Sequence, residues 1–443
     1  MVGKRDKTPQ LNFFSTPLVQ FIDLERPICK LAHQIDWEKV EKDFSAYYSK
    51  LGAPSIPIRK MVGLIILKQL FNLSDEEVVE QWLENPYWQY FCGETVFQKK
   101  YPFDPSDFVH FRKRIGKEGA EKILKLSIDL FGNTVRDRGV KIDTTVQEKN
   151  VTFPTDTKLH VKIIRKCQKI ANENGIVLRQ SYTRTIPGLM MVQRFRKHPK
   201  SRKKAHAAAR KIKTIAGRLV RELDRKLPDE LHAQYNDQLK LFKKILAQKR
   251  GSKNKIYSLH EPAVQCIAKG KDHKPYEFGN KSSFVVTSDS GIIVGALAFR
   301  NNPYDGHTLI KQLQQVHRLW DKLPDYAVVD RGYKGRNKVL GTEIVIPRKL
   351  PETATEYQRK TLRKRCRNRA GIEPVIGHLK SDYRLGRNFL KGVPGDAINT
   401  ILAAAAFNIR KWITIQVDFF FSFWNLVFQL IFNPKISPLK MSF

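Results

Sequence analysis

The first 135 residues carry apolar side chains at helical spacing. Residues 59–73 repeat them every three to four positions, as a helix with a buried face does. The next residues, Ser74-Asp-Glu-Glu, combine an N-cap serine with acidic first-turn residues and predict a helix over 76–83. A basic helix is predicted from Ser106. A short helix, a capped turn and a basic helix predict a helical domain over 1–135 that binds DNA, as helix-turn-helix proteins do. We also expect this domain to help the protein dimerise.

Short β-branched runs replace this pattern from residue 140 onward. Residues 140–146, Val-Lys-Ile-Asp-Thr-Thr-Val, predict a strand, and 151–154 are a candidate neighbouring strand. A helix is predicted after His307 and a basic helical region from Thr355. Further strand patterns occur at 283–287, 291–299, 325–330 and 342–347. Strands that alternate with helices predict an α/β domain over 136–416.

One part of this domain departs from the alternation. Residues 156–253 are helical and strongly basic, so we predict a helical insertion in the α/β domain. Within it, apolar residues at helical spacing form a stripe, and the cations fall on other faces of the helix. The stripe consists of Ile212, Ile215, Leu219 and Leu223.

Charge narrows the class of partner. The chain holds 80 lysines and arginines against 43 aspartates and glutamates, a formal net charge of +37. An excess of this size indicates a polyanion, with DNA or RNA favoured over a membrane surface and over a merely solvated surface. Five scattered cysteines without a CxxC pair argue against a disulfide framework and a zinc site, and no apolar signal-peptide region follows the N-terminus. We therefore expect a cytoplasmic nucleic-acid-binding protein.

The end of the chain is unusually apolar. Residues 417–432 are rich in phenylalanine, but they are fewer than the roughly 20 residues of a membrane-spanning helix and include Asp418, Asn425 and Gln429. The favoured interpretation is a helix packed on the protein or on a partner subunit. A membrane-associated tail and a poorly ordered sticky end are the alternatives for this third segment, 417–443.

Candidate chemistry concentrates in Arg369-Ala-Gly-Ile-Glu373-Pro-Val-Ile-Gly-His-Leu-Lys380, where a carboxylate lies between two cations. Asp143 and Asp330, each within or at the end of a predicted strand, complete a set of three carboxylates. Mg²⁺ prefers such oxygen ligands, and two ions about 4 Å apart can stabilise both the attacking and the leaving oxygen of a phosphoryl transfer. Arg369 and Lys380 are candidate phosphate ligands.

Simpler interpretations exist for each of these residues. Asp330 precedes Arg-Gly-Tyr and fits a turn, and Asp143 fits a cap for the threonines that follow it. On one continuous helix, Arg369, Glu373 and Lys380 share a narrow arc. A helix that begins at the proline after Glu373 leaves Arg369 outside it. A surface salt bridge between Arg369 and Glu373 is then the simpler alternative.

These residues carry a resemblance to a known family. The chain resembles the bacterial insertion-sequence transposases with a DDE catalytic site, over about residues 59–412. The family signature Y-x2-R-x3-E-x6-K places its last three residues at Arg369, Glu373 and Lys380, while Cys366 stands at its tyrosine position. This departure concerns an aromatic contact to DNA and leaves the metal site intact. Other matching patches are Lys141-Ile-Asp-Thr-Thr-Val-Gln-Glu-Lys-Asn, Ile256-Tyr-Ser-Leu-His-Glu-Pro, Asn302-Pro-Tyr-Asp-Gly-His and Asp330-Arg-Gly-Tyr-Lys-Gly.

The resemblance implies an RNase H-like catalytic core in which Asp143, Asp330 and Glu373 hold Mg²⁺, with Mn²⁺ as the alternative ion. It also implies double-stranded DNA as substrate, both terminal inverted repeats and target DNA, and a homodimer in the synaptic complex, with no small-molecule substrate. His307 lies in a matching patch, where a structural position near a helix N-terminus is favoured. Asp156 is a rival first ligand, and Asp143 is preferred for its strand and its motif.

We therefore predict a DNA transposase that cuts the ends of an insertion sequence and joins the 3′ ends to target DNA. A nuclease of the same fold without strand transfer and a non-catalytic DNA-binding derivative of a transposase are the alternatives. Three cations of the basic insertion are expected to contact DNA phosphates whatever the sequence, namely Lys203, Lys204 and Arg210.

Overall fold

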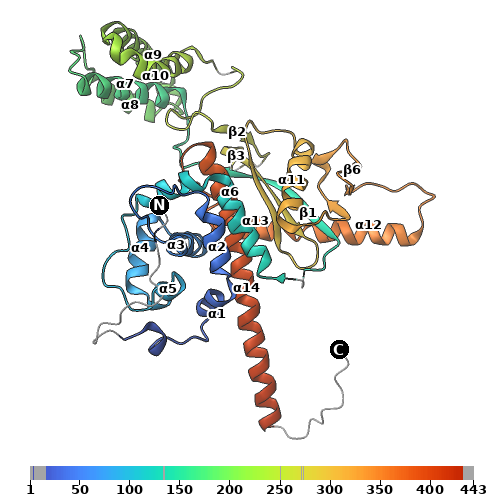
Figure 1. The fold of residues 1–443 in the computed structure, drawn as a ribbon. Helices are drawn as coiled ribbons and strands as arrows, with labels where there is room; N and C mark the ends of the chain where they lie inside the picture. Colours follow the sequence, from blue (N-terminus) through green and yellow to red (C-terminus); the bar gives the residue numbers. More distant parts are fainter. Residues whose placement is uncertain are drawn as a thin grey trace. The chain divides into compact units, whose positions relative to one another are not determined.

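The computed structural model describes residue 3 and residues 16–432, except 133, 134, 250, 271 and 273, with side chains up to residue 417. The chain divides into two compact units (Figure 1). Unit 1 comprises Met1–Glu148 and Lys281–Phe443, and unit 2 comprises Lys149–Asn280. Each unit has a hydrophobic core of its own. The domain boundaries expected from the sequence stay a prediction.

Unit 1 begins with a helical region, as the sequence predicts. Its centre is α3 (Ile58–Leu70), which is buried along most of its length because apolar residues occupy nearly all its faces. Ser74 and Glu77 cap each other's backbone N–H groups and so start α4 (Asp75–Glu84). The other helices of this region are α1 (Pro27–Gln34), α2 (Trp37–Ser45), α5 (Pro86–Phe91) and α6 (Asp107–Asp129).

A mixed sheet forms the second part of unit 1. β1 (Gly139–Glu148) lies between β3 (Tyr276–Thr287) and β5 (Tyr326–Val328) in the strand order. β1 and β5 are parallel, and β5 is parallel to β7 (Thr342–Val345). Two antiparallel strands extend the sheet, β4 (Ile293–Phe299) on β3 and β6 (Lys338–Val339) on β7. The sheet therefore combines a parallel centre with antiparallel additions.

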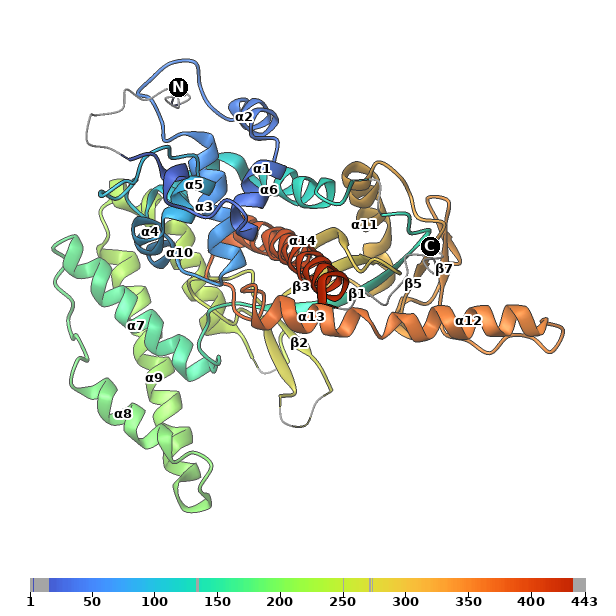
Figure 2. The same ribbon diagram turned by 90° about the horizontal axis from the view of Figure 1, so that it is seen from below.

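Helices on the sheet join it to the helical region in one core. α11 (Asp305–Trp320) contacts β4, and so does α14 (Gly392–Phe432), which also packs on α6 and α3. α13 (Ile372–Ser381) contacts β1, and α12 (Glu356–Arg369), which directly precedes it, contacts β5 and β7 (Figure 2). The predicted combination of an α/β domain with a helical N-terminal region is thus confirmed.

The apolar end of the chain continues α14. This helix runs without interruption to Phe432, so the backbone of 417–432 is helical. The side chains of 418–432 and all of 433–443 lie outside the described part of the structure, and the packing expected for this tail stays a prediction. None of the described helices is both long and apolar enough to cross a membrane.

The described residues of unit 2 form four helices and β2 (Gln265–Ala268), which pairs with the first residues of β3. The helices are α7 (Asp156–Glu173), α8 (Thr185–Arg194), α9 (Pro199–Lys226) and α10 (Asp229–Ala247). The predicted apolar stripe of α9 is buried along its whole length. The strand predicted at 151–154 is wrong: Pro154 has no N–H to donate, and the Thr155 side chain accepts the Lys158 N–H to cap α7.

Candidate active site

Parallel strands bring the two predicted aspartates to the same level of the sheet. β1 and β5 are paired with Lys141 opposite Val328. Asp143 and Asp330 each follow this pair by two positions. Neighbouring strands lie about 4.8 Å apart and side chains two positions apart share a face, so the two carboxylates face the same side of adjacent chain segments.

The segment that carries Arg369 and Glu373 is not one helix. α12 ends at Arg369, residues 370 and 371 intervene, and α13 begins at Ile372 with Glu373 in its first turn. Of the two arrangements that the sequence left open, the structure has the one in which Arg369 lies outside the helix that carries Glu373, although this helix begins at Ile372 and not at Pro374. Pro374 is tolerated because the first N–H groups of a helix have no partner within it.

Arg369 nevertheless joins two of the predicted carboxylates. Its Nη1 lies 3.4 Å from Asp143 Oδ2, and its Nη2 lies 3.6 Å from Glu373 Oε1. The Asp143 side chain is 19% exposed and that of Glu373 is 66% exposed. The salt bridge between Arg369 and Glu373 is thus present, and the same guanidinium also reaches Asp143. Lys380 follows Glu373 by seven positions near the end of α13.

The electrostatic environment of Asp143 is unusual. Burial raises the pKa of its carboxyl group from 3.8 to about 6, and the negative charges of Asp330 and Asp305 act in the same direction. The Thr144 N–H, which donates to Asp143 Oδ1 at 2.8 Å, and the charge of Arg369 partly offset this effect. Negative charge is therefore concentrated in a water-poor site, where a cation is strongly stabilised.

Asp305 is a fourth carboxylate of the cluster, and the sequence analysis did not single it out. Its Oδ1 accepts hydrogen bonds from Thr144 Oγ1 and Lys281 Nζ, both at 2.8 Å. A Cβ atom placed on Gly332 would lie within 3.5 Å of carboxylate oxygens of both Asp305 and Asp330. The signal available in the sequence was the matching patch at 302–307, in which this is the acidic residue.

Tyr333 completes the buried side of the cluster. Its side chain is 1% exposed, and its hydroxyl makes no hydrogen bond of ordinary geometry to the described residues. Burial, together with the charges of Asp305, Asp143 and Asp330, raises the pKa of this phenol well above 10. The hydroxyl therefore stays protonated at neutral pH and is available as a hydrogen-bond donor.

The remaining candidate residues are distributed over both units. His307 lies in the first turn of α11, its ring packed on that of Tyr304 at a centroid distance of 5.5 Å, which is the structural position favoured for it. Asp156 opens α7 in unit 2 and pairs with Lys255 Nζ at 3.0 Å. Three exposed cations lie on α9 of unit 2, namely Lys203, Lys204 and Arg210.

Comparison with known proteins identifies the family. Residues 16–114 match the family described as Transposase domain (DUF772), and residues 260–409 match the Transposase DDE domain. The chain is 41% identical over 189 residues to an uncharacterized protein, ORF8 in the nfe locus of Rhizobium meliloti, an alignment that covers 42% of this chain and 91% of that protein. No solved structure gives a significant match. The chain belongs to the DDE transposases of bacterial insertion sequences, which confirms the resemblance seen in the sequence.

Proposed function

We propose that this transposase cuts DNA at the ends of an insertion sequence and joins the freed 3′ ends to target DNA. The observation that carries the proposal is that Asp143 and Asp330 occupy equivalent positions on adjacent parallel segments. Arg369 pairs with both Asp143 and Glu373 and so links the third carboxylate to the first. The mixed sheet with a parallel centre supports an RNase H-like core. Terminal inverted repeats as the recognised DNA and a homodimer as the synaptic form belong to the same proposal.

The donor set fits Mg²⁺ or Mn²⁺. Carboxylate oxygens are hard ligands. Burial, followed by the negative charges of Asp330 and Asp305, raises the pKa of Asp143, and a cation bound there would offset those charges. In the described arrangement no group of three His, Cys, Asp or Glu residues converges closely enough to hold a metal, and Glu373 pairs with Arg369 instead. Asp143 and Asp330 would hold the ions, and Glu373 would join them on leaving Arg369. Ions held by these residues would supply activation of the attacking oxygen and stabilisation of the leaving one.

The chain's own residues position the DNA and the carboxylates. Lys281 and Thr144 fix the Asp305 carboxylate, and the Thr144 N–H in turn fixes the orientation of Asp143. Arg369 offers a planar pair of donors to a phosphate, and Lys380 adds a mobile positive charge on the same side of the break between α12 and α13 as Glu373. The exposed cations of α9 are proposed to contact DNA phosphates without regard to sequence.

A reaction with the natural DNA tests this proposal. The purified chain is incubated with Mg²⁺, a target plasmid and DNA that contains the flanks of its own gene, and the products are mapped by sequencing. We expect cuts at the element ends and covalent joints between their 3′ ends and the plasmid. Cuts without joints would favour the nuclease alternative, and DNA binding without cuts would favour a non-catalytic derivative.

A further inference from the structure

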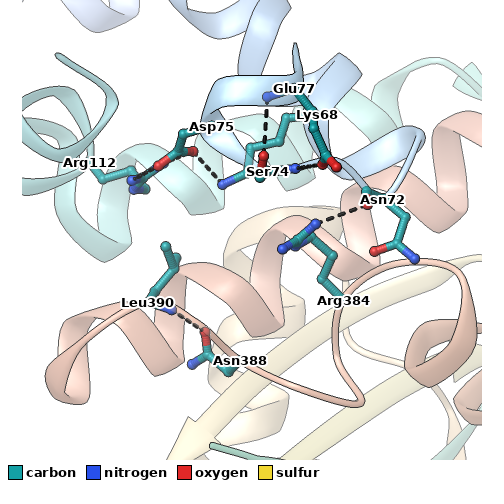
Figure 3. Close-up of polar contacts among 9 residues, drawn as sticks. All are labelled: Lys68, Asn72, Ser74, Asp75, Glu77, Arg112, Arg384, Asn388 and Leu390. Carbon is teal, nitrogen blue, oxygen red and sulfur yellow. Dashed lines mark hydrogen bonds and ion pairs between the residues drawn. The ribbon is translucent and has the colours of Figure 1, made fainter. Parts of the chain in front are cut away.

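A large cavity lies within unit 1, next to α13. Its volume is about 1050 Å³, and its lining comes from the helical N-terminal region and from the segment that runs from the end of α13 into α14. Residues of α3, α4 and α6 supply one wall, and residues within 380–402 supply the other. Figure 3 shows polar residues of both walls. The cavity is therefore lined both by the part of unit 1 that matches the Transposase domain (DUF772) and by the part that matches the Transposase DDE domain.

The lining is strongly basic. Seven lysine and arginine side chains line the cavity, against three carboxylates. One of the carboxylates, Asp75, is already neutralised by ion pairs with Lys68 at 2.5 Å and Arg112 at 2.6 Å (Figure 3). Exposed cations from both walls remain, among them Lys113 of α6 and Lys391. Charge complementarity therefore points to an anionic chain as the occupant.

An aromatic side chain is presented among these cations. Phe389 is 54% exposed, and the guanidinium groups of Arg384 and Arg387 lie 5.2 and 5.9 Å from its ring centroid. The Arg384 Nη1 donates to the Asn72 carbonyl at 2.9 Å, which ties this group to the opposite wall (Figure 3). Large exposed aromatic rings flanked by cations are a common platform for stacking nucleic-acid bases.

The loop that holds Phe389 is fixed by buried hydrogen bonds. Asn388 is 1% exposed, and its side chain donates to Asp396 Oδ1 at 2.7 Å. The same side chain accepts the Leu390 N–H at 2.9 Å (Figure 3). Its own N–H donates to the Glu148 carbonyl at 2.7 Å. The backbone on either side of Phe389 is therefore fixed before any ligand binds, which lowers the entropic cost of binding.

The cavity begins close to the proposed catalytic carboxylates. Lys380 lines it and follows Glu373 by seven residues on α13, which corresponds to about 10 Å along the helix. We propose that the cavity receives a short single-stranded segment of the DNA strand being cut, with a base stacked on Phe389 and phosphates near Lys380, Arg387 and Lys391. Its volume suits a few nucleotides and is too small for a duplex. This proposal rests on the proposed function, because it names the form of DNA that the same site takes.

Binding measured without metal tests the proposal separately from catalysis. Fluorescence anisotropy of the full chain is recorded with a blunt duplex and with the same duplex carrying a short oligothymidine extension. Phe389→Ala is expected to weaken binding of the extended duplex by about 5- to 150-fold, since one stacked base contributes that much, and to leave the blunt duplex unchanged. Phe389→Trp is expected to restore the affinity. Phe21→Ala is the matched control, because Phe21 is 51% exposed and lies outside the cavity lining.

The cations give a second, independent readout. Replacing Arg387 and Lys391 together by glutamine is expected to lower the salt slope of binding to the extended duplex by about 0.7 per lost contact, and not the slope for the blunt duplex. The proposal would be overturned if a variant lost affinity equally for both DNAs. It would also be overturned if Phe389→Ala lost no more affinity for the extended duplex than Phe21→Ala does. If the wild-type protein fails to cut DNA but binds the extended duplex more tightly than the blunt duplex, the proposed function fails and the cavity assignment stands.

Discussion

A buried ion-pair network holds three helices of unit 1 together and permits a quantitative prediction. Asp75, the first residue of α4, accepts from Arg112 Nη1 and Nη2 of α6 at 2.8 and 2.6 Å, and from Lys68 Nζ of α3 at 2.5 Å. These side chains are only 8 to 18% exposed. Burial lowers the pKa of Lys68 to about 8, and Arg112 contributes in the same direction against the opposing charge of Asp75. One carboxylate therefore pairs with two buried cations.

The substitution Asp75→Asn keeps the shape of the side chain and removes its charge. Two buried cations then face each other, and breaking a buried pair in this way costs about 3–5 kcal/mol of unfolding free energy. Loss of the proton from Lys68 limits the cost. Because the folded-state pKa of Lys68 lies below its unfolded value of 10.5, the unfolded state binds more protons between about 8 and 10.5, and stability rises with pH across this window. In Asp75→Asn the window extends to lower pH.

Tryptophan fluorescence during guanidinium unfolding measures this effect, because all six tryptophans lie in unit 1. Glu76→Gln is the matched control: it removes a carboxylate from the adjacent exposed position and should change the unfolding free energy by less than about 0.5 kcal/mol. An Asp75→Asn variant within about 1 kcal/mol of wild type, or no more destabilised than Glu76→Gln, would refute the idea that the network stabilises unit 1.

Three further predictions concern other parts of the chain. Arg369→Ala should slow end cleavage while metal binding, followed by calorimetry, persists; an unchanged rate would remove its phosphate role. Neutralising Lys203, Lys204 and Arg210 together should make the salt dependence of DNA binding shallower by about 0.9 per lost contact and weaken all sequences alike, whereas a loss for one sequence alone would contradict a backbone-tracking surface. His160 is buried, and burial lowers its pKa from 6.5 to about 4. The unfolding free energy of unit 2 should therefore fall by up to about 3 kcal/mol as pH falls from 6.5 to 4. His160→Leu should abolish this acid sensitivity in circular dichroism melts.

Local sequence signals predicted the parts of the fold that depend on neighbouring residues. The start of α4 followed from Ser74 and Glu77, whose reciprocal capping is complete within four positions. The strands that lead to Asp143 and Asp330 could also be predicted, because runs of β-branched residues favour strands whatever their partners. The strand expected at 151–154 failed because the cap at Thr155 starts a helix at once.

Contacts between residues far apart in the sequence could not be predicted from local patterns. Asp305 gains its place from Thr144 and Lys281, 161 and 24 positions away, and no local pattern reports such contacts. The break after Arg369 was open in the sequence, because a glycine and a proline close together allow either a continuous helix or two helices. The basic cavity beside α13 likewise exists only once the N-terminal helices pack near Phe389.

The central claim is that Asp143, Asp330 and Glu373 form the catalytic site, and one measurement tests it directly. Cleavage of DNA carrying the element ends is compared, with Mg²⁺, between wild type and the single variants Asp143→Asn, Asp330→Asn and Glu373→Gln. Asp156→Asn serves as the control, because Asp156 is the rival first ligand and lies in unit 2. The account predicts that the three variants bind this DNA with unchanged affinity and do not cut it, while Asp156→Asn cuts as wild type does. Cleavage by any of the three, or its loss only in Asp156→Asn, would contradict the account.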